Sequence, residues 1–95
     1  MVIWSKAARI QLQKAFAFIS NDSPQNAEKV ITEIIDTTIA LSKYPEKYPT
    51  DRYKKNNNGS YRAFEVYHYR ISYRIVNDNI YIVRMRHTSM SPLIY

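Results

Sequence analysis

The chain has no cysteine and one glycine among its 95 residues. Without cysteine it forms no disulfide, offers no thiolate nucleophile and builds no cysteine-type zinc site. With one glycine it lacks the glycine-rich loops that cradle phosphates. No apolar run approaches the roughly 18 residues that a membrane span needs, and the basic residues among the first 14 positions do not resemble a signal peptide. We therefore expect a cytoplasmic protein that has no membrane partner.

Length and hydrophobic content favour one folded domain. Ninety-five residues suit a single domain, and a hydrophobic fraction of 45% is enough for a core. A chain of this length buries roughly 60–65% of its unfolded surface, so its stability margin is small. We expect residues 1–95 to form that single domain.

Acidic residues are scarce in the second half of the chain. Residues 52–95 contain only Glu65 and Asp78, whereas six acidic and six basic residues cancel in residues 1–51. The formal net charge of +6 therefore lies in the C-terminal half, on these basic residues: Arg52, Lys54, Lys55, Arg62, Arg70, Arg74, Arg84 and Arg86. A field of one sign on part of a small domain indicates an anionic partner.

The first half of the chain predicts a short strand and a helix. Residues 2–4 have the character of a strand, and Ser5 is a suitable N-cap for the helix that follows. The residues on one face of this helix are Ala8, Leu12, Ala15, Phe16 and Ile19.

A second helix is predicted after a short break at residues 21–24. Ser23 is a suitable N-cap, and Pro24 fits the first helical position, where its missing N–H costs nothing. The helix is expected to run to about Tyr44, because Pro45 disfavours helix in the residue before it. Its apolar stripe consists of Ala27, Ile31, Ile34, Ile35, Thr38 and Leu41. So short a link predicts an antiparallel helical hairpin.

The remaining sequence predicts a basic loop followed by antiparallel strands. Prolines, asparagines and Gly59 indicate a loop over residues 45–60. From Tyr61 the hydrophobic period becomes two, with strands expected from Tyr61 onward, over 69–76 and over 80–88. The tyrosines expected to face the core are Tyr69, Tyr73 and Tyr81.

The turn between the last two strands sets their register. A two-residue turn at 77–78 would place Arg84 on the apolar face, whereas a three-residue turn at 77–79 pairs Tyr73 with Val83 and Ile71 with Met85. We therefore predict the three-residue turn, with Asn79 in the left-handed conformation. One face of the hairpin then carries Arg70, Arg74, Arg84 and Arg86 without acidic partners, and Arg70 lies opposite Arg86. Like charges across a strand pair are destabilising, so this face predicts a site for an anion or an acidic segment.

Three segments resemble a known family. Residues 69–75, Tyr-Arg-Ile-Ser-Tyr-Arg-Ile, are similar to the Tyr-Arg-Ile-x-Tyr core strand of RelE/ParE family toxins. Residues 82–87, Ile-Val-Arg-Met-Arg-His, resemble the following strand of the ParE branch, which typically ends in histidine. Residues 4–8, Trp-Ser-Lys-Ala-Ala, resemble the start of the family's first helix. The likeness covers nearly the whole chain.

This resemblance implies an α+β fold, with a short N-terminal strand and an antiparallel helical hairpin packed on a twisted, mainly antiparallel four-stranded sheet. It also implies the toxin of a type II toxin–antitoxin, or plasmid stabilisation, system. A cognate antitoxin with an acidic or amphipathic segment would neutralise it, in a possible hetero-oligomer. The ParE branch inhibits DNA gyrase and is not a known hydrolase, whereas the RelE branch cuts mRNA on the ribosome.

The two branches assign different roles to the same residues. In a RelE-like nuclease, Arg70 matches the arginine that holds the scissile phosphate and His87 would act as an acid. In a ParE-like protein we expect the binding residues for antitoxin or target to be Arg62, Arg70, Arg74, Arg84, Arg86, Lys54 and Lys55. Residues 88–91, Thr-Ser-Met-Ser, lack the groups that mRNA-cleaving relatives place there.

The sequence offers no metal-ligand cluster and no paired carboxylates, so we expect no metal and no cofactor. Three functional hypotheses remain: a ParE-like inhibitor, which the residues after His87 favour, a RelE-like ribosome-dependent mRNA endonuclease, and a degenerate member of the family that is no longer toxic. Only the second is an enzyme.

Overall fold

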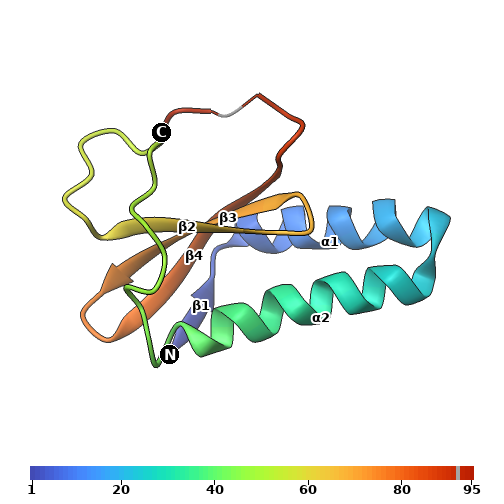
Figure 1. Ribbon diagram of the computed structural model, residues 1–95, viewed down its shortest axis with the longest axis horizontal. Coiled ribbons are helices and arrows are strands. Elements are labelled where there is room, and N and C mark those ends of the chain that lie inside the picture. Colours follow the sequence, from blue (N-terminus) through green and yellow to red (C-terminus); the bar gives the residue numbers. More distant parts are fainter. Residues whose placement is uncertain (92) are drawn as a thin grey trace.

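The computed structural model describes residues 1–91 and 93–95. Its elements follow the chain as β1 (Val2–Trp4), α1 (Lys6–Asp22), α2 (Pro24–Ala40), β2 (Tyr61–Val66), β3 (Tyr69–Val76) and β4 (Asn79–His87). The strands form one sheet in the order β1-β4-β3-β2, with β1 parallel to β4 and the other neighbours antiparallel. The helical hairpin lies against this sheet (Figure 1). The predicted α+β fold is confirmed.

Both predicted helix N-caps are confirmed. The Ser5 hydroxyl accepts a hydrogen bond from the Ala8 N–H at 3.0 Å and donates to the Val83 carbonyl at 3.1 Å, which ties the start of α1 to β4. The Ser23 hydroxyl accepts from the Asn26 N–H at 3.1 Å, and Pro24 begins α2. These bonds satisfy N–H groups that have no partner within their helix.

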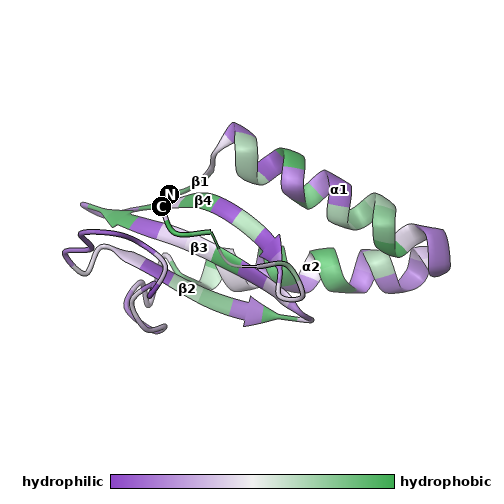
Figure 2. Cartoon of the chain, turned by 90° about the horizontal axis from the view of Figure 1, so that it is seen from above, coloured by the Kyte–Doolittle hydropathy of each residue, from purple (hydrophilic) through white to green (hydrophobic). Residues whose placement is uncertain are grey.

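The helix faces differ from the prediction at their edges. α2 ends at Ala40 instead of Tyr44. The backbone N–H groups of residues 41–43 donate to the carbonyls three residues before them, so this segment forms tight turns instead of a further α-helical turn. Phe16 and Ile35 are 43% and 36% exposed, so they lie outside the core, whereas Val30, which the predicted stripe omitted, is buried. Figure 2 shows the helices with apolar and polar residues along their length.

The β3–β4 register corrects the predicted turn. Val76 pairs with Asn79, so the turn has two residues, and Asn77 adopts the left-handed conformation (φ 55°) instead of Asn79. The register then shifts at a β-bulge between the Tyr73–Ile82 and Ser72–Arg84 pairs. A two-residue turn without a bulge would place Arg84 on the apolar face, but the extra residue lets Ile82 and Met85 both face the core. Beyond the bulge the predicted pairs hold, and Arg70 lies opposite Arg86.

The core lies between the helices and one face of the sheet. Its residues come from both helices, the turn after α2 and three strands: Ala8, Ala15, Val30, Ile34, Leu41, Phe64, Tyr69, Ile71, Tyr73, Ile80, Ile82 and Met85. Tyr69 and Tyr73 are buried as predicted, and the Tyr73 hydroxyl donates to the Pro45 carbonyl at 2.7 Å. The prediction for Tyr81 was wrong, because Tyr81 pairs with exposed Arg74 and shares its face.

The other face of the sheet is partly covered by the loop that precedes β2 and by the C-terminal residues. The Tyr95 N–H donates to the Tyr53 carbonyl at 2.9 Å, and the Lys55 N–H donates to the Tyr95 carbonyl at 2.6 Å. Figure 1 accordingly shows the C-terminus beside this loop.

Neither helix within the described ranges combines the length and the apolar character that crossing a bilayer requires.

Candidate functional site

A pocket of about 220 Å³ lies on the sheet face opposite the helices. Four arginines line it: Arg52 from the loop, Arg70 from β3, and Arg84 and Arg86 from β4. We call these four residues the arginine pocket. The other lining residues are Tyr53, Glu65, Ser72, His87, Thr88 and Met90. The structure thus brings together three of the arginines that the sequence placed on one face, and adds Arg52 from the loop.

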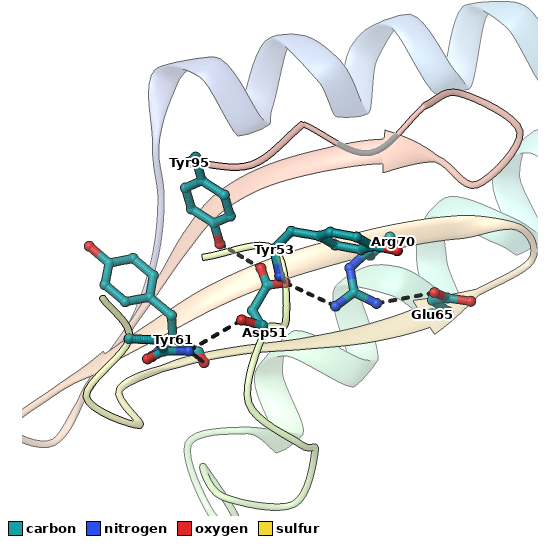
Figure 3. Close-up of polar contacts among 7 residues, drawn as sticks. Asp51, Tyr53, Tyr61, Glu65, Arg70 and Tyr95 are labelled. Atoms are coloured by element: carbon teal, nitrogen blue, oxygen red, sulfur yellow. Dashed lines mark hydrogen bonds and ion pairs between the residues drawn. The ribbon is translucent and has the colours of Figure 1, made fainter. Parts of the chain in front are cut away.

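Asp51 is a buried carboxylate beside the arginine pocket, and it is 2% exposed. Its Oδ1 accepts from Arg70 Nη2 at 2.9 Å and from the Tyr53 N–H at 3.1 Å, while its Oδ2 accepts from the Tyr95 hydroxyl at 2.6 Å (Figure 3). It therefore joins loop, sheet and C-terminal residues. In the sequence, Asp51 is visible only as one charge of the balanced first half, since nothing there links it to a residue 19 positions later.

The hydrogen bonds at Asp51 shift two pKa values in opposite directions. Burial raises the pKa of Asp51, but hydrogen bonds from Tyr95, Arg70 and Tyr53 outweigh this effect and hold the pKa below its ordinary value of 3.8. Burial and the hydrogen bond to Asp51 raise the pKa of the Tyr95 hydroxyl to about 12. At neutral pH an ionised Asp51 therefore accepts from a protonated Tyr95.

The lowered pKa of Asp51 predicts stability that is lost in acid. The folded state binds the Asp51 proton less tightly than the unfolded state, so the carboxylate stabilises the fold above the unfolded pKa near 3.8, and this contribution disappears as pH falls through the folded pKa. We expect the urea midpoint to fall between about pH 5 and pH 3, and to fall less in Asp51→Asn. Urea titrations at several pH values measure this, and equal pH dependence in both proteins would contradict the assignment.

Arg70 has two acidic partners, so the expectation that it is unpaired was wrong. Its Nη2 pairs with Asp51 at 2.9 Å and its Nη1 with Glu65 Oε2 at 3.1 Å. Glu65 lies directly opposite on β2, where opposite charges stabilise a strand pair, and Asp51 approaches from the loop. The Tyr53 ring lies 4.9 Å from the guanidinium carbon. Arg70 is therefore held in place on the sheet (Figure 3).

Arg84 and Arg86 form no ion pair with any carboxylate in residues 1–91 and 93–95. The Arg84 guanidinium carbon lies 3.9 Å from the Tyr95 ring centroid, and burial lowers the pKa of Arg84. Arg86 Nη2 donates to the Ser91 carbonyl at 3.1 Å, while its buried Nε has no hydrogen-bond partner among the described atoms. Partly desolvated cations without a counter-charge cost free energy, which a bound anion would offset.

Three other predicted residues lie where the loop meets the same sheet face. Arg74 is exposed, and its guanidinium carbon is 5.0 Å from the Tyr61 ring centroid. Lys54 Nζ is 4.7 Å from the same centroid. The backbone N–H of Lys55 donates a hydrogen bond to the Tyr95 carbonyl. None of the three lines the arginine pocket.

Arg62 is separate from the other predicted residues. It pairs with Tyr73 on the core-facing side of the sheet, and its Nη1 donates to the Tyr48 carbonyl at 2.7 Å. That bond holds the loop before β2 against the sheet. The structure therefore places Arg62 away from the arginine pocket.

His87 lies at the end of β4 and lines the same pocket as Arg70. Its Nδ1 accepts from the Ser89 N–H at 3.1 Å and lies 2.7 Å from Ser89 Oγ, so Nδ1 carries the lone pair and the proton of the neutral ring is on Nε2. The Tyr69 ring packs edge-on at 5.0 Å. The ring shares the core-facing side of β4 with Met85 and is half-buried.

The site offers cations and hydrogen-bond donors. Its acids, Asp51 and Glu65, are both bonded to Arg70. Within the described ranges no three histidine or acidic side chains are grouped so that they could hold a metal ion. The arrangement is therefore suited to binding an anion through guanidinium groups.

Comparisons with known proteins agree with this fold. A family model described as the ParE toxin of the type II toxin–antitoxin system parDE matches residues 2–92. The chain is also similar to a solved structure of a chromosomal ParDE TA system from P. aeruginosa, with a TM-score of 0.68 and 16% sequence identity. That match covers 90% of this chain and 92% of the other, and at this identity it supports the fold alone. No curated protein sequence matches.

Proposed function

From the premise that this chain belongs to the ParE toxin family of type II toxin–antitoxin systems, we propose that it inhibits an essential nucleic-acid-handling target such as DNA gyrase. A cognate antitoxin neutralises it by covering the arginine pocket. The observation that carries this proposal is that Arg84 and Arg86 are partly buried and have no carboxylate partner among the residues that the structure describes. A partner that supplies anionic groups gains charge-assisted hydrogen bonds there.

The proposed binding surface is narrower than the sequence suggested. It consists of Arg84 and Arg86, with Arg52 and Arg70 beside them and with Arg74, Lys54 and Lys55 at its margin. Arg62 does not belong to it, because its guanidinium is bonded to a loop carbonyl on the other side. Arg70 serves mainly to shape the pocket, since both of its terminal nitrogens are already paired.

A RelE-like mRNA endonuclease is the second candidate, and one observation favours it. Arg70 and His87 line the same pocket. A nuclease needs such proximity between the cation that binds the phosphate, here Arg70, and the acid that protonates the leaving oxygen, here His87. Two features weigh against it. Arg70 is neutralised by two carboxylates, and these carboxylates, Asp51 and Glu65, are bonded to it instead of being free to act as the base.

Induced expression in bacterial cells tests the proposal. We expect growth arrest with DNA damage and inhibited gyrase supercoiling, and rescue when the adjacent reading frame is co-expressed. Mapping of mRNA ends distinguishes the candidates, because cuts within codons that vanish in Arg70→Ala would support the nuclease instead. A folded, soluble protein that does not arrest growth would contradict both and favour the degenerate family member.

A further inference from the structure

Three large apolar side chains of the helical hairpin lie outside the core. Phe16 on α1 and Ile35 on α2 are partly exposed, and Ile39 on α2 is 60% exposed. We call these three residues the hairpin strip. Exposed apolar groups that cluster mark surfaces where another molecule binds, so the placement of the three on the two helices decides whether they form an interface.

Phe16 lies on the flank of α1 that faces α2. The other flank faces the end of β4, because Lys14 and Phe18 line a cavity there with Met85. Residues two positions apart in a helix point about 200° apart, so Phe16 points away from that cavity. Figure 2 shows α1 and α2 side by side, and the side chain is therefore directed toward the neighbouring helix.

Ile35 and Ile39 lie on the flank of α2 that faces α1. The other flank faces the loop before β2, because Glu33 lines a cavity there with Tyr48, and β2 is at the opposite edge of the sheet from β1 and β4. Ile35 is two positions after Glu33 and so points away from this loop, and Ile39 follows one turn later on the same side. The hairpin strip thus runs along the line where the two helices meet.

Spacing along the hairpin makes the strip complementary to itself. Phe16 lies seven residues before Ser23 and is therefore level with Val30, seven residues after it. The rise of an α-helix then places Phe16 about 7.5 Å from Ile35 in one direction and Ile39 about 6 Å from it in the other. A half-turn about an axis through Ile35 consequently sets Phe16 of one copy against Ile39 of a second copy, and Ile35 against its counterpart.

Charged residues at the two ends of the strip match under the same half-turn. Lys6 begins α1 at the end of the hairpin near Ile39, whereas Glu28 lies near the other end, two turns before Ile35 and on the same side of α2. Lys6 and Glu28 are exposed, and neither forms an ion pair within residues 1–91 and 93–95. The half-turn brings Lys6 of each copy close to Glu28 of the other, which favours this orientation.

We propose that two copies of this chain form a symmetric dimer through the hairpin strip. A two-fold interface requires a surface that complements itself, and both the apolar side chains and the charges meet this requirement. A partner of another kind would need only the apolar groups and not their symmetric arrangement. The arginine pocket lies on the sheet face opposite the helices, so both pockets stay open in the dimer, and the inference does not rest on the proposed function.

Sedimentation equilibrium of the full chain over a range of concentrations tests the dimer. We expect the average mass to rise from 11.3 kDa toward twice that value as the concentration increases. Ile35→Glu places two like charges next to the axis and should raise the dissociation constant about 100-fold. Phe18→Ser is the matched control, because Phe18 is also an exposed apolar residue but lies on the other flank of α1, and it should leave the dissociation constant unchanged.

Exchange of the charges tests the orientation of the two copies. Lys6→Glu or Glu28→Lys alone should raise the dissociation constant about tenfold, because a dimer contains two contacts between these residues and each becomes repulsive. The double variant restores opposite charges and should return the dissociation constant to that of the wild type. Both positions are exposed, so we expect these variants to fold, and thermal midpoints verify the fold of every protein.

Three outcomes would overturn the dimer. The first is a wild-type chain that stays monomeric at every concentration. The second is a dimer whose dissociation constant does not change in Ile35→Glu, and the third is a double charge variant that associates as weakly as the single variants. Growth arrest on induction is measured separately, so the toxin proposal would stand in each of these cases while the dimer fails.

Discussion

Asp51→Asn is expected to lower the free energy of unfolding by about 3 kcal/mol, the lower end of the range for breaking a buried ion pair. The Asp51 side chain has no exposed surface, whereas the Arg70 side chain is 17% exposed. Water can therefore solvate part of the Arg70 charge once its partner is removed, which keeps the loss of stability at this lower end. The substitution removes the charge that Arg70 faces and weakens the bond from the Tyr95 hydroxyl. Because Asp51 joins loop, sheet and C-terminal residues, all three should loosen.

Glu65→Gln is the matched control, since Glu65 pairs with the same arginine. The Glu65 side chain is 52% exposed, and exposed ion pairs contribute less than about 1 kcal/mol. Urea denaturation of both variants at pH 7 measures the difference. Equal losses in the two proteins would show that burial of Asp51 has no special importance for the fold.

The double substitution Arg84→Glu with Arg86→Glu is expected to abolish growth arrest, with viability on inducer rising by about 100-fold or more. Both guanidinium groups line the pocket, and neither has a carboxylate partner in the described part of the chain, so reversing their charge removes two favourable interactions with an anionic partner and adds two repulsive ones. The substitutions should also weaken binding of the antitoxin. Plating on inducer measures the first effect, and affinity for the adjacent reading frame's product measures the second.

Local sequence signals predicted the fold well. Ser5, Ser23 and Pro24 set where the helices begin, and each acts within three residues of its own position. Alternation along β3 correctly placed Tyr69 and Tyr73 in the core. The register near the turn was not predictable in this way, because the bulge between Ile82 and Arg84 is stabilised by burial of Met85 in the tertiary structure.

The candidate site was predicted in part, because strand alternation is a local signal whereas contacts with irregular segments are not. Strand parity placed Arg70, Arg84 and Arg86 on one face, and the structure groups them in one pocket. Parity could not show that Asp51 pairs with Arg70 or that Tyr95 packs on Arg84, because Asp51 and Tyr95 reach the sheet from irregular segments. Arg62 was assigned to the binding surface from its charge alone, but its strand position puts it opposite Tyr73 on the core-facing side.

The central claim is that the arginine pocket is the surface through which the protein acts. Its most direct test is the plating efficiency, on inducer, of Arg84→Glu with Arg86→Glu beside the control Arg9→Glu with Lys29→Glu. The control makes the same change in net charge at two exposed helix positions, and thermal midpoints establish that all proteins are folded. We expect the control to arrest growth like the wild type and the pocket variant to grow. Growth arrest by the pocket variant as strong as that of the wild type would contradict it.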